Sequence, residues 1–387
     1  AGGRPTAALR GTVALTRWQA GPYPDDEAGG EIVVGTDGRA VPQGTFDAEF
    51  TARVPCGDPP PGGWPLLTFI DGTGGTYDLG ATILPLTYEG YLIAEIAPVY
   101  GQGRGIVVTP LMQQLGITTA SGASQFTFYN FFNPDAARTN TIQQTGENLQ
   151  LLDAMEHLSL DGSTLGTSGT VHTDPTREVA AGQSQGAQTL PMVASVRPSL
   201  AGVVASAGSG GLYHTISHVK GNRDLLGALS GDAAALDELN PVVQVAQTML
   251  EGGDGINFPS TVDYLNYDGR EDTCVPFDTS RYFAGATGLP IAYSDPPASI
   301  YGDPAVDPPT VVLPARGNVA GHTRVSVERP GQHYVAYDQI GVTASFLADI
   351  AAGVVPTVPA SGYSFGPNSS LPCGTVRWDV PPTRFGR

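Results

Sequence analysis

The sequence predicts an α/β fold with a mostly parallel central sheet. Apolar runs at 66–70, 91–99, 200–206 and 262–267 show no alternation with polar residues, which is typical of strands covered on both faces. Helical patterns at 139–158 and 187–196 lie between these runs, with apolar residues recurring at three- and four-residue steps. Strands that alternate with helices along a chain indicate a parallel sheet flanked by helices.

The remaining elements complete this prediction. Residues 45–54 alternate between apolar and polar side chains, so we expect a half-buried, antiparallel strand near the N-terminus. Further strands are expected at 178–181 and 323–327, and a helix at 342–350. Helical patches at 225–229 and 241–250 fall within a looser region. We interpret the chain as a single domain spanning 1–387, with a helical cap inserted at about 210–258.

Composition excludes several classes of protein. The chain has 387 residues, of which 41% are hydrophobic, and this suffices for a large core. A net charge of −18 makes nucleic acid an improbable partner, because phosphate neutralisation needs clustered basic residues. No run approaches the roughly 18 apolar residues of a membrane-spanning helix. We expect a monomer.

The cysteines and the first residue of the sequence bear on the compartment of the protein. Cys56, Cys274 and Cys373 allow one intramolecular bridge with three possible pairings, and their spacing matches no zinc pattern. We expect one disulfide and one free thiol, with three reduced thiols as the alternative. Because the chain begins at Ala1 rather than Met, we expect a processed N-terminus and a secreted or periplasmic protein.

The segment Gly182-Gln183-Ser184-Gln185-Gly186 is the most informative motif. It lies between an expected strand and an expected helix, and a nucleophile on such a tight turn leaves no room for side chains at its two glycines. The alternative is a glycine-rich turn with a capping serine. The context favours Ser184 as a nucleophile exposed above the sheet.

A serine nucleophile needs a base, and the base needs an orienting acid. After the strand at 262–267 comes an acidic loop in which Asp272 is the first choice, with Asp268 and Glu271 as alternatives. His333 follows the strand at 323–327 and is the expected base. His322 precedes that strand and would lie at its opposite end.

The loop 71–75, Asp-Gly-Thr-Gly-Gly, ends another core strand and is suited to an oxyanion hole. We assign one donor to the backbone of Thr73 or Gly74 and the second to Gln185, the residue after the nucleophile. A phosphate-binding loop is the alternative, but the Lys-Ser/Thr pair of a P-loop is missing. His214 and His218 could share a helix face, yet the glutamate of a zinc protease is absent, so we expect no metal.

Together these segments resemble secreted bacterial lipases and esterases of the α/β-hydrolase superfamily. The resemblance rests on the order of the loop at 71–75, the stretch 129–133 with the following helix, the elbow at 182–186, the segments 240–243 and 257–258, the acid loop and the base. It implies a hydrolase of carboxylic esters with Ser184, Asp272 and His333 as the triad and no cofactor. Asp71 departs from the histidine that many relatives have there.

The expected substrate is a small-molecule, lipid or polymeric ester. Leu212, Tyr213 and Val242, in the predicted cap, would line its pocket together with Ile216, Val243 and Val245. A polyester depolymerase with the same triad is one alternative. A non-catalytic binding protein on a hydrolase scaffold is another.

Overall fold

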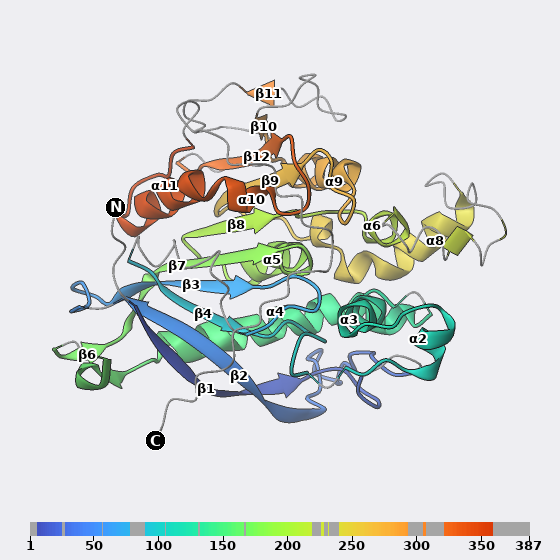
Figure 1. The fold of residues 1–387 in the computed structure, drawn as a ribbon, viewed down its shortest axis with the longest axis horizontal. Helices are drawn as coiled ribbons and strands as arrows, with labels where there is room; N and C mark the ends of the chain where they lie inside the picture. The colour runs from blue at the N-terminus through green and yellow to red at the C-terminus, as the bar shows by residue number, and fades with distance from the viewer. Residues whose placement is uncertain are drawn as a thin grey trace.

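The computed structural model describes residues 6–24, 28–55, 57–77, 90–104, 106–130, 132–165, 168–218, 226–227, 231, 240–292, 305–306 and 321–358. Within them, ten strands form one sheet in the order β1-β2-β4-β3-β7-β8-β9-β12-β10-β11 (Figure 1). The strands in that order are β1 (Thr6–Arg17), β2 (Gly44–Pro55), β4 (Leu92–Ile96), β3 (Trp64–Ile70), β7 (Thr173–Gln183), β8 (Gly202–Ser206), β9 (Asp263–Gly269), β12 (Arg324–Arg329), β10 (Ile291–Ala292) and β11 (Ala305–Val306).

From β4 to β11 all neighbouring strands are parallel, whereas β1, β2 and β4 pair antiparallel. The predicted mostly parallel sheet with an antiparallel N-terminal part is therefore confirmed. The alternating segment at 45–54 is strand β2, as expected. Strand β1 was not predicted, because Gly11 interrupts its alternation. A Cβ at Gly11 would lie 2.7 Å from the Phe50 ring, so the glycine makes room for that ring.

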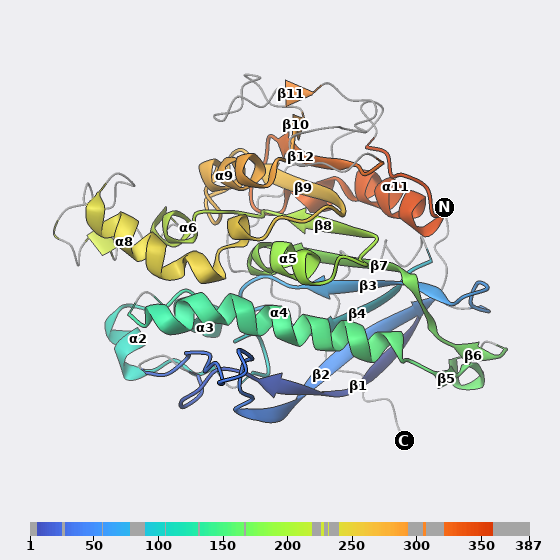
Figure 2. The same ribbon diagram turned by 180° about the vertical axis from the view of Figure 1, so that it is seen from behind.

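Two layers of helices cover the sheet (Figures 1 and 2). Helices α4 (Pro134–Glu156), α5 (Gln185–Val196) and α9 (Phe277–Thr287) lie on one face, and α11 (Ile340–Ala351) lies on the other. The larger hydrophobic cluster joins the first face to α4 and α5, and a second cluster joins the opposite face to α11. Burial on both faces explains why the central strands are continuously apolar.

Helix α4 begins at Pro134, earlier than the predicted Thr139. Asn133 caps it, since its side chain accepts a hydrogen bond from the N–H of Ala136, and proline is favoured at the first helical position. Many of the buried residues of this helix are polar, among them Asn140, Gln143 and Gln144. The apolar pattern therefore predicted the helix from Thr139 onward but missed its N-terminal residues 134–138.

The other elements are short. Helix α6 (Leu212–His218) and helix α8 (Pro241–Leu250) fall within the expected cap. The second matches its prediction, whereas the patch at 225–229 lies mostly outside the described residues, and the cap stays a prediction. The rest are α2 (Pro110–Gln114), α3 (Ala120–Phe128), α10 (Val335–Asp338), β5 (Leu160–Asp161), β6 (Thr170–Val171), η1 (Gly162–Leu165), η3 (Glu251–Gly253) and η4 (Gly255–Asn257). In the described part of the chain, no helix is both long and apolar enough to cross a membrane.

Candidate active site

The candidate residues gather at one edge of the sheet. The loops that carry Thr73, Ser184, Asp272 and His333 follow the carboxyl ends of strands β3, β7, β9 and β12, which all point the same way (Figure 1). In open parallel sheets this edge is where ligands bind. The sheet alone thus brings residues that are far apart in the sequence into one region.

Ser184 occupies a strained turn between β7 and α5. Its φ of 55° and ψ of −118° are unfavourable for a residue with a side chain, at about 1–3 kcal/mol. Its N–H donates to the carbonyl of Ser206 at 2.8 Å, and its own carbonyl accepts from the N–H of Gln188 at 3.0 Å. These bonds hold the turn, which is the geometry expected of a nucleophile elbow.

The two glycines of the motif are required by close backbone packing. A Cβ at Gly182 would lie 2.8 Å from the carbonyl carbon of Gly186, and a Cβ at Gly186 would overlap the carbonyl oxygen of Ile70 at the end of β3. Neither neighbour is a flexible side chain that could move aside. The glycines therefore allow the nucleophile turn to pack directly against the adjacent strand.

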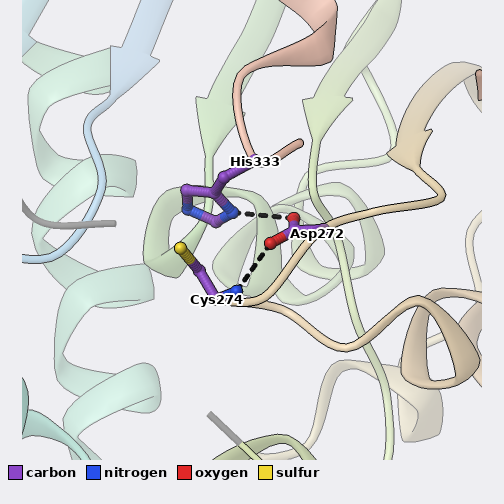
Figure 3. A group of neighbouring side chains, drawn as sticks. All are labelled: Asp272, Cys274 and His333. Carbon is purple, nitrogen blue, oxygen red and sulfur yellow. Dashed lines mark hydrogen bonds and ion pairs between the residues drawn. The ribbon is translucent and has the colours of Figure 1, made fainter. Parts of the chain in front are cut away.

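Asp272 and His333 form a buried hydrogen-bonded pair (Figure 3). Nδ1 of His333 donates to Oδ2 of Asp272 at 2.8 Å, and the two residues are 5% and 9% exposed. Oδ1 of Asp272 accepts the N–H groups of Cys274 at 2.7 Å and Val275 at 3.0 Å. With its proton held on Nδ1, a neutral His333 keeps a lone pair on Nε2, the form that a general base requires.

The alternative acids have other partners. Oδ2 of Asp268 accepts from Asn266 Nδ2 at 2.8 Å and from the Ser326 hydroxyl. Glu271 instead accepts the N–H of Gly331, and so joins its loop to the loop that precedes His333. His322 lies at the other end of the sheet beside Asp263, with Nδ1 and Oδ2 3.3 Å apart, as its position before the strand predicted.

The loop after β3 approaches the nucleophile. A Cβ built on Gly72 would lie 3.3 Å from Cβ of Ser184. The Asp71 carboxylate accepts the N–H groups of Gly72 at 2.7 Å and Thr76 at 3.1 Å, and the N–H of Gly75 donates to the Gly72 carbonyl at 2.9 Å. No hydrogen bond within the described part of the chain uses the N–H groups of Thr73 and Gly74, one of which we expected to be the first oxyanion donor.

Asp71 therefore has a structural role in place of the expected histidine: its carboxylate closes the loop on itself. Its negative charge also acts on the neighbouring site. Burial raises the pKa of Tyr334 to about 12, and the charges of Asp71 and Asp272 contribute to this increase. The Tyr334 ring meets the His333 ring edge to face, with centroids 5.2 Å apart.

Asp272, Cys274 and His333 are close enough to hold a metal ion, since their ligand atoms lie within 4.8 Å of one another. Their chemistry fits an acid–base pair better. Cys274 is part of a disulfide, so its sulfur is no thiolate ligand, and both oxygens of Asp272 already accept hydrogen bonds. The predicted disulfide thus involves Cys274, and its partner lies outside the described residues.

The predicted pocket residues lie on α6 and α8. Leu212 is buried in a cluster with Tyr129, and Tyr213 is half-buried. The side chain of Val242 lies outside the described residues. On α6, His214 and His218 stack with ring centroids 3.9 Å apart. The pocket assignment stays a prediction.

The chain aligns with solved structures of other proteins. Acetyl xylan esterase 1 from Thermoanaerobacterium sp. JW/SL YS485 aligns with a TM-score of 0.50 and 13% identity, over 79% of this chain and 79% of that chain. An acetyl xylan esterase from Paenibacillus sp. R4 aligns with a TM-score of 0.49 and 14% identity, over 89% of both chains. A puromycin-hydrolyzing peptidase of Mycobacterium tuberculosis aligns with a TM-score of 0.46 and 12% identity, over 86% of this chain but 40% of that one.

The chain therefore has the α/β-hydrolase fold. No protein-family model matches the chain, and no curated protein sequence matches it. At these levels of identity the comparison shows the fold alone.

Two residues at the site were not predicted. The Tyr129 hydroxyl donates to Oε1 of Gln188 at 2.7 Å, and Nε2 of Gln188 donates to the Ser209 hydroxyl at 2.7 Å. Tyr129 lies in a stretch that carried the family resemblance, yet no role was assigned to it. For Gln188, the only available signal was its place one helical turn after Ser184.

Proposed function

We propose that the protein is a serine hydrolase of carboxylic esters in which Ser184, His333 and Asp272 form the catalytic triad. One juxtaposition carries this proposal: a strained serine turn and a buried His333–Asp272 pair at the same edge of an α/β-hydrolase sheet. In a catalytic triad the serine is the nucleophile, the histidine is the general base, and the aspartate orients the imidazole and stabilises its charged form.

In the first half of the proposed reaction, Nε2 of His333 removes the hydroxyl proton of Ser184 as Oγ attacks the ester carbonyl. Asp272 stabilises the imidazolium that forms. The N–H groups of Gln185 and of Thr73 or Gly74 stabilise the oxyanion. The C–O bond then breaks, and the leaving alkoxide takes the proton from Nε2, which leaves an acyl group on Ser184.

In the second half, His333 removes a proton from water as the water oxygen attacks the acyl carbon. The carbonyl re-forms, the bond to Oγ breaks, and Oγ recovers the proton from Nε2. The products are a carboxylic acid and an alcohol. No step requires a cofactor, because every proton is transferred between the substrate, water and the triad.

A location outside the cytoplasm is part of the proposal. The disulfide at Cys274 supports it, since structural disulfides persist in oxidising compartments and are rare in the cytosol. The substrate would then be an extracellular ester, whether small, lipid or polymeric.

A substrate panel tests the function. Wild-type protein and the Ser184→Ala variant would be assayed on nitrophenyl esters of increasing chain length, emulsified triglyceride and polyester film. Ser168→Ala is a matched control, because Ser168 is exposed and bonded to Asp58 far from the site edge. We expect hydrolysis by the wild type and the control, and loss of at least about 10³-fold in Ser184→Ala.

Preference for the film would make the enzyme a polyester depolymerase, and preference for triglyceride a lipase. Absence of hydrolysis across the panel would favour a non-catalytic binding protein on this scaffold. Full activity of Ser184→Ala would refute the triad.

A further inference from the structure

A closed ring of buried hydrogen bonds joins helix α4 to the residue that follows Ser184. Oε1 of Gln144 accepts from Nε2 of Gln185 at 2.6 Å and from the N–H of Val99 at 3.0 Å. Nε2 of Gln185 also donates to the Val99 carbonyl at 3.2 Å, which closes the ring. Both glutamines are 0% exposed. Helices α4 and α5 lie next to each other on one face of the sheet (Figure 2), and the ring lies where α5 begins.

The available donors fix how the Gln144 amide is turned. Its Nε2 donates to the Thr189 hydroxyl at 2.7 Å, and that hydroxyl donates its single proton to the Gln185 carbonyl at 3.0 Å. With the amide turned over, its NH₂ group would face the N–H of Val99, and two donors cannot bond to each other. Gln185 is therefore held at two places, through its side chain and through its carbonyl.

The backbone N–H of Gln185 is the group that this arrangement leaves for a substrate. Gln185 is the first residue of α5, so its N–H has no acceptor within the helix. Its side chain is buried and bonded to Gln144 and Val99. The N–H is also the donor that we expect to stabilise the oxyanion together with the loop after β3.

The Val99 side of the ring leads to that loop. Val99 belongs to the segment after β4, in which the N–H of Gln102 donates to the Gly75 carbonyl at 2.8 Å. The two segments also pack closely, since a Cβ on Gly101 would lie 2.6 Å from the same carbonyl oxygen. The two segments expected to supply oxyanion donors are therefore connected through Gln144.

We propose that Gln144 is a positioning residue that holds the N–H of Gln185 in place relative to the donors of the loop after β3. This inference rests on the proposed function. The two donors come from separate segments and have to converge on one oxygen, so a fixed connection between the segments keeps them preorganised as charge develops. Gln144 is expected to act on the transition state more than on substrate binding, because the full negative charge is present only there.

The test replaces the amide by an apolar side chain of similar length. For Gln144→Met we expect kcat on nitrophenyl acetate to fall about tenfold, the magnitude of one well-placed hydrogen bond, while KM stays within about twofold. The Ki of a trifluoromethyl ketone, which forms a tetrahedral oxyanion adduct, should rise by the same factor as kcat/KM falls. A loss of stability alone would not link these two values.

Gln143→Met is the matched control, because Gln143 is the neighbouring buried glutamine of the same helix. Its side chain accepts the N–H of Trp18 at 2.8 Å and donates to the Thr16 carbonyl at 3.0 Å, beside β1. The control should lower the melting temperature to a similar extent and leave kcat unchanged. Unchanged kcat in a folded Gln144→Met would overturn the inference, as would a rise in KM alone or an equal fall in kcat for Gln143→Met.

A variant of Gln185 keeps the test decisive if Gln144→Met fails to fold. Gln185→Met removes the same link from its other end but keeps the backbone N–H, so kcat should fall to a similar extent, and an unchanged kcat would also overturn the inference. The double variant should lose no more than either single change, whereas multiplicative losses would contradict the link. An inactive wild type would refute the proposed function and this inference with it. An active wild type with an unaffected Gln144→Met would refute only this inference.

Discussion

The substitution Asp272→Asn tests the acid with little change in shape. In the native protein Oδ1 accepts two backbone N–H groups and Oδ2 faces Nδ1 of His333. The amide oxygen of Asn must take the place of Oδ1, because two N–H donors cannot face an NH₂ group. The NH₂ group then faces His333, whose Nδ1 has to become an acceptor. The imidazole proton consequently moves to Nε2, and the base loses its lone pair there.

This wrong tautomer is expected to lower kcat by about 10⁴-fold, as the same change does in serine proteases. Stability should change little, by about 1 kcal/mol, since the variant keeps its hydrogen bonds. The assay is kcat on nitrophenyl acetate beside urea unfolding. Asp268→Asn, near the end of the preceding strand β9, is the matched control, with an expected loss below about tenfold. A near-native rate for Asp272→Asn, or a severe loss only in Asp268→Asn, would refute the assignment of the acid.

Three further predictions concern the surroundings of the site. Gly186→Ala should destabilise the protein by about 3 kcal/mol or more in chemical denaturation, because the new methyl group overlaps the rigid Ile70 carbonyl. Gly252→Ala is the control and should not destabilise the protein to this extent, because its new methyl group would meet the flexible Arg138 side chain. Equal stabilities of the two variants would contradict the packing argument. Burial raises the pKa of Asp268 from 3.8 to about 7, so the folded state holds a proton that the unfolded chain loses. Stability should therefore fall as the pH rises from about 4 to about 7, by up to about 4 kcal/mol. Asp268→Asn should lose this part of the pH dependence, and an equally steep dependence of its unfolding free energy on pH would exclude Asp268 as the cause. Reduction of the disulfide at Cys274 should lower stability by about 2–4 kcal/mol, with a fall in kcat because the loop of Asp272 loosens; unchanged thermal unfolding after verified reduction would contradict it.

Much of the fold and of the candidate site could be predicted because their signals are local. The apolar strands at 66–70 and 262–267 are followed by a glycine-rich loop and an acidic loop, respectively. The elbow at 182–186 lies between a strand and a helix. Since parallel strands end at one edge, the order of these loops sufficed to bring Ser184 and the pair Asp272–His333 to the same side of the sheet.

The rest depends on contacts between residues distant in the sequence. Tyr129 and Gln188 are 59 positions apart, and a hydrogen bond between them leaves no periodic pattern. The buried amides of α4 look like a solvent-exposed helix face in the sequence, although Gln144 Oε1 accepts from Gln185 Nε2 at 2.6 Å behind the elbow. Hydrophobic periodicity does not predict which polar side chains are buried and hydrogen-bonded inside the fold.

Covalent labelling tests the central claim most directly. Wild-type protein, Ser184→Ala and Ser168→Ala would be treated with a fluorophosphonate, and the adduct located by peptide mass spectrometry. We expect one adduct, on Ser184, in the wild type and in Ser168→Ala, with loss of esterase activity in step with labelling. An adduct on another residue, or an unlabelled wild type that still hydrolyses esters, would contradict Ser184 as the nucleophile.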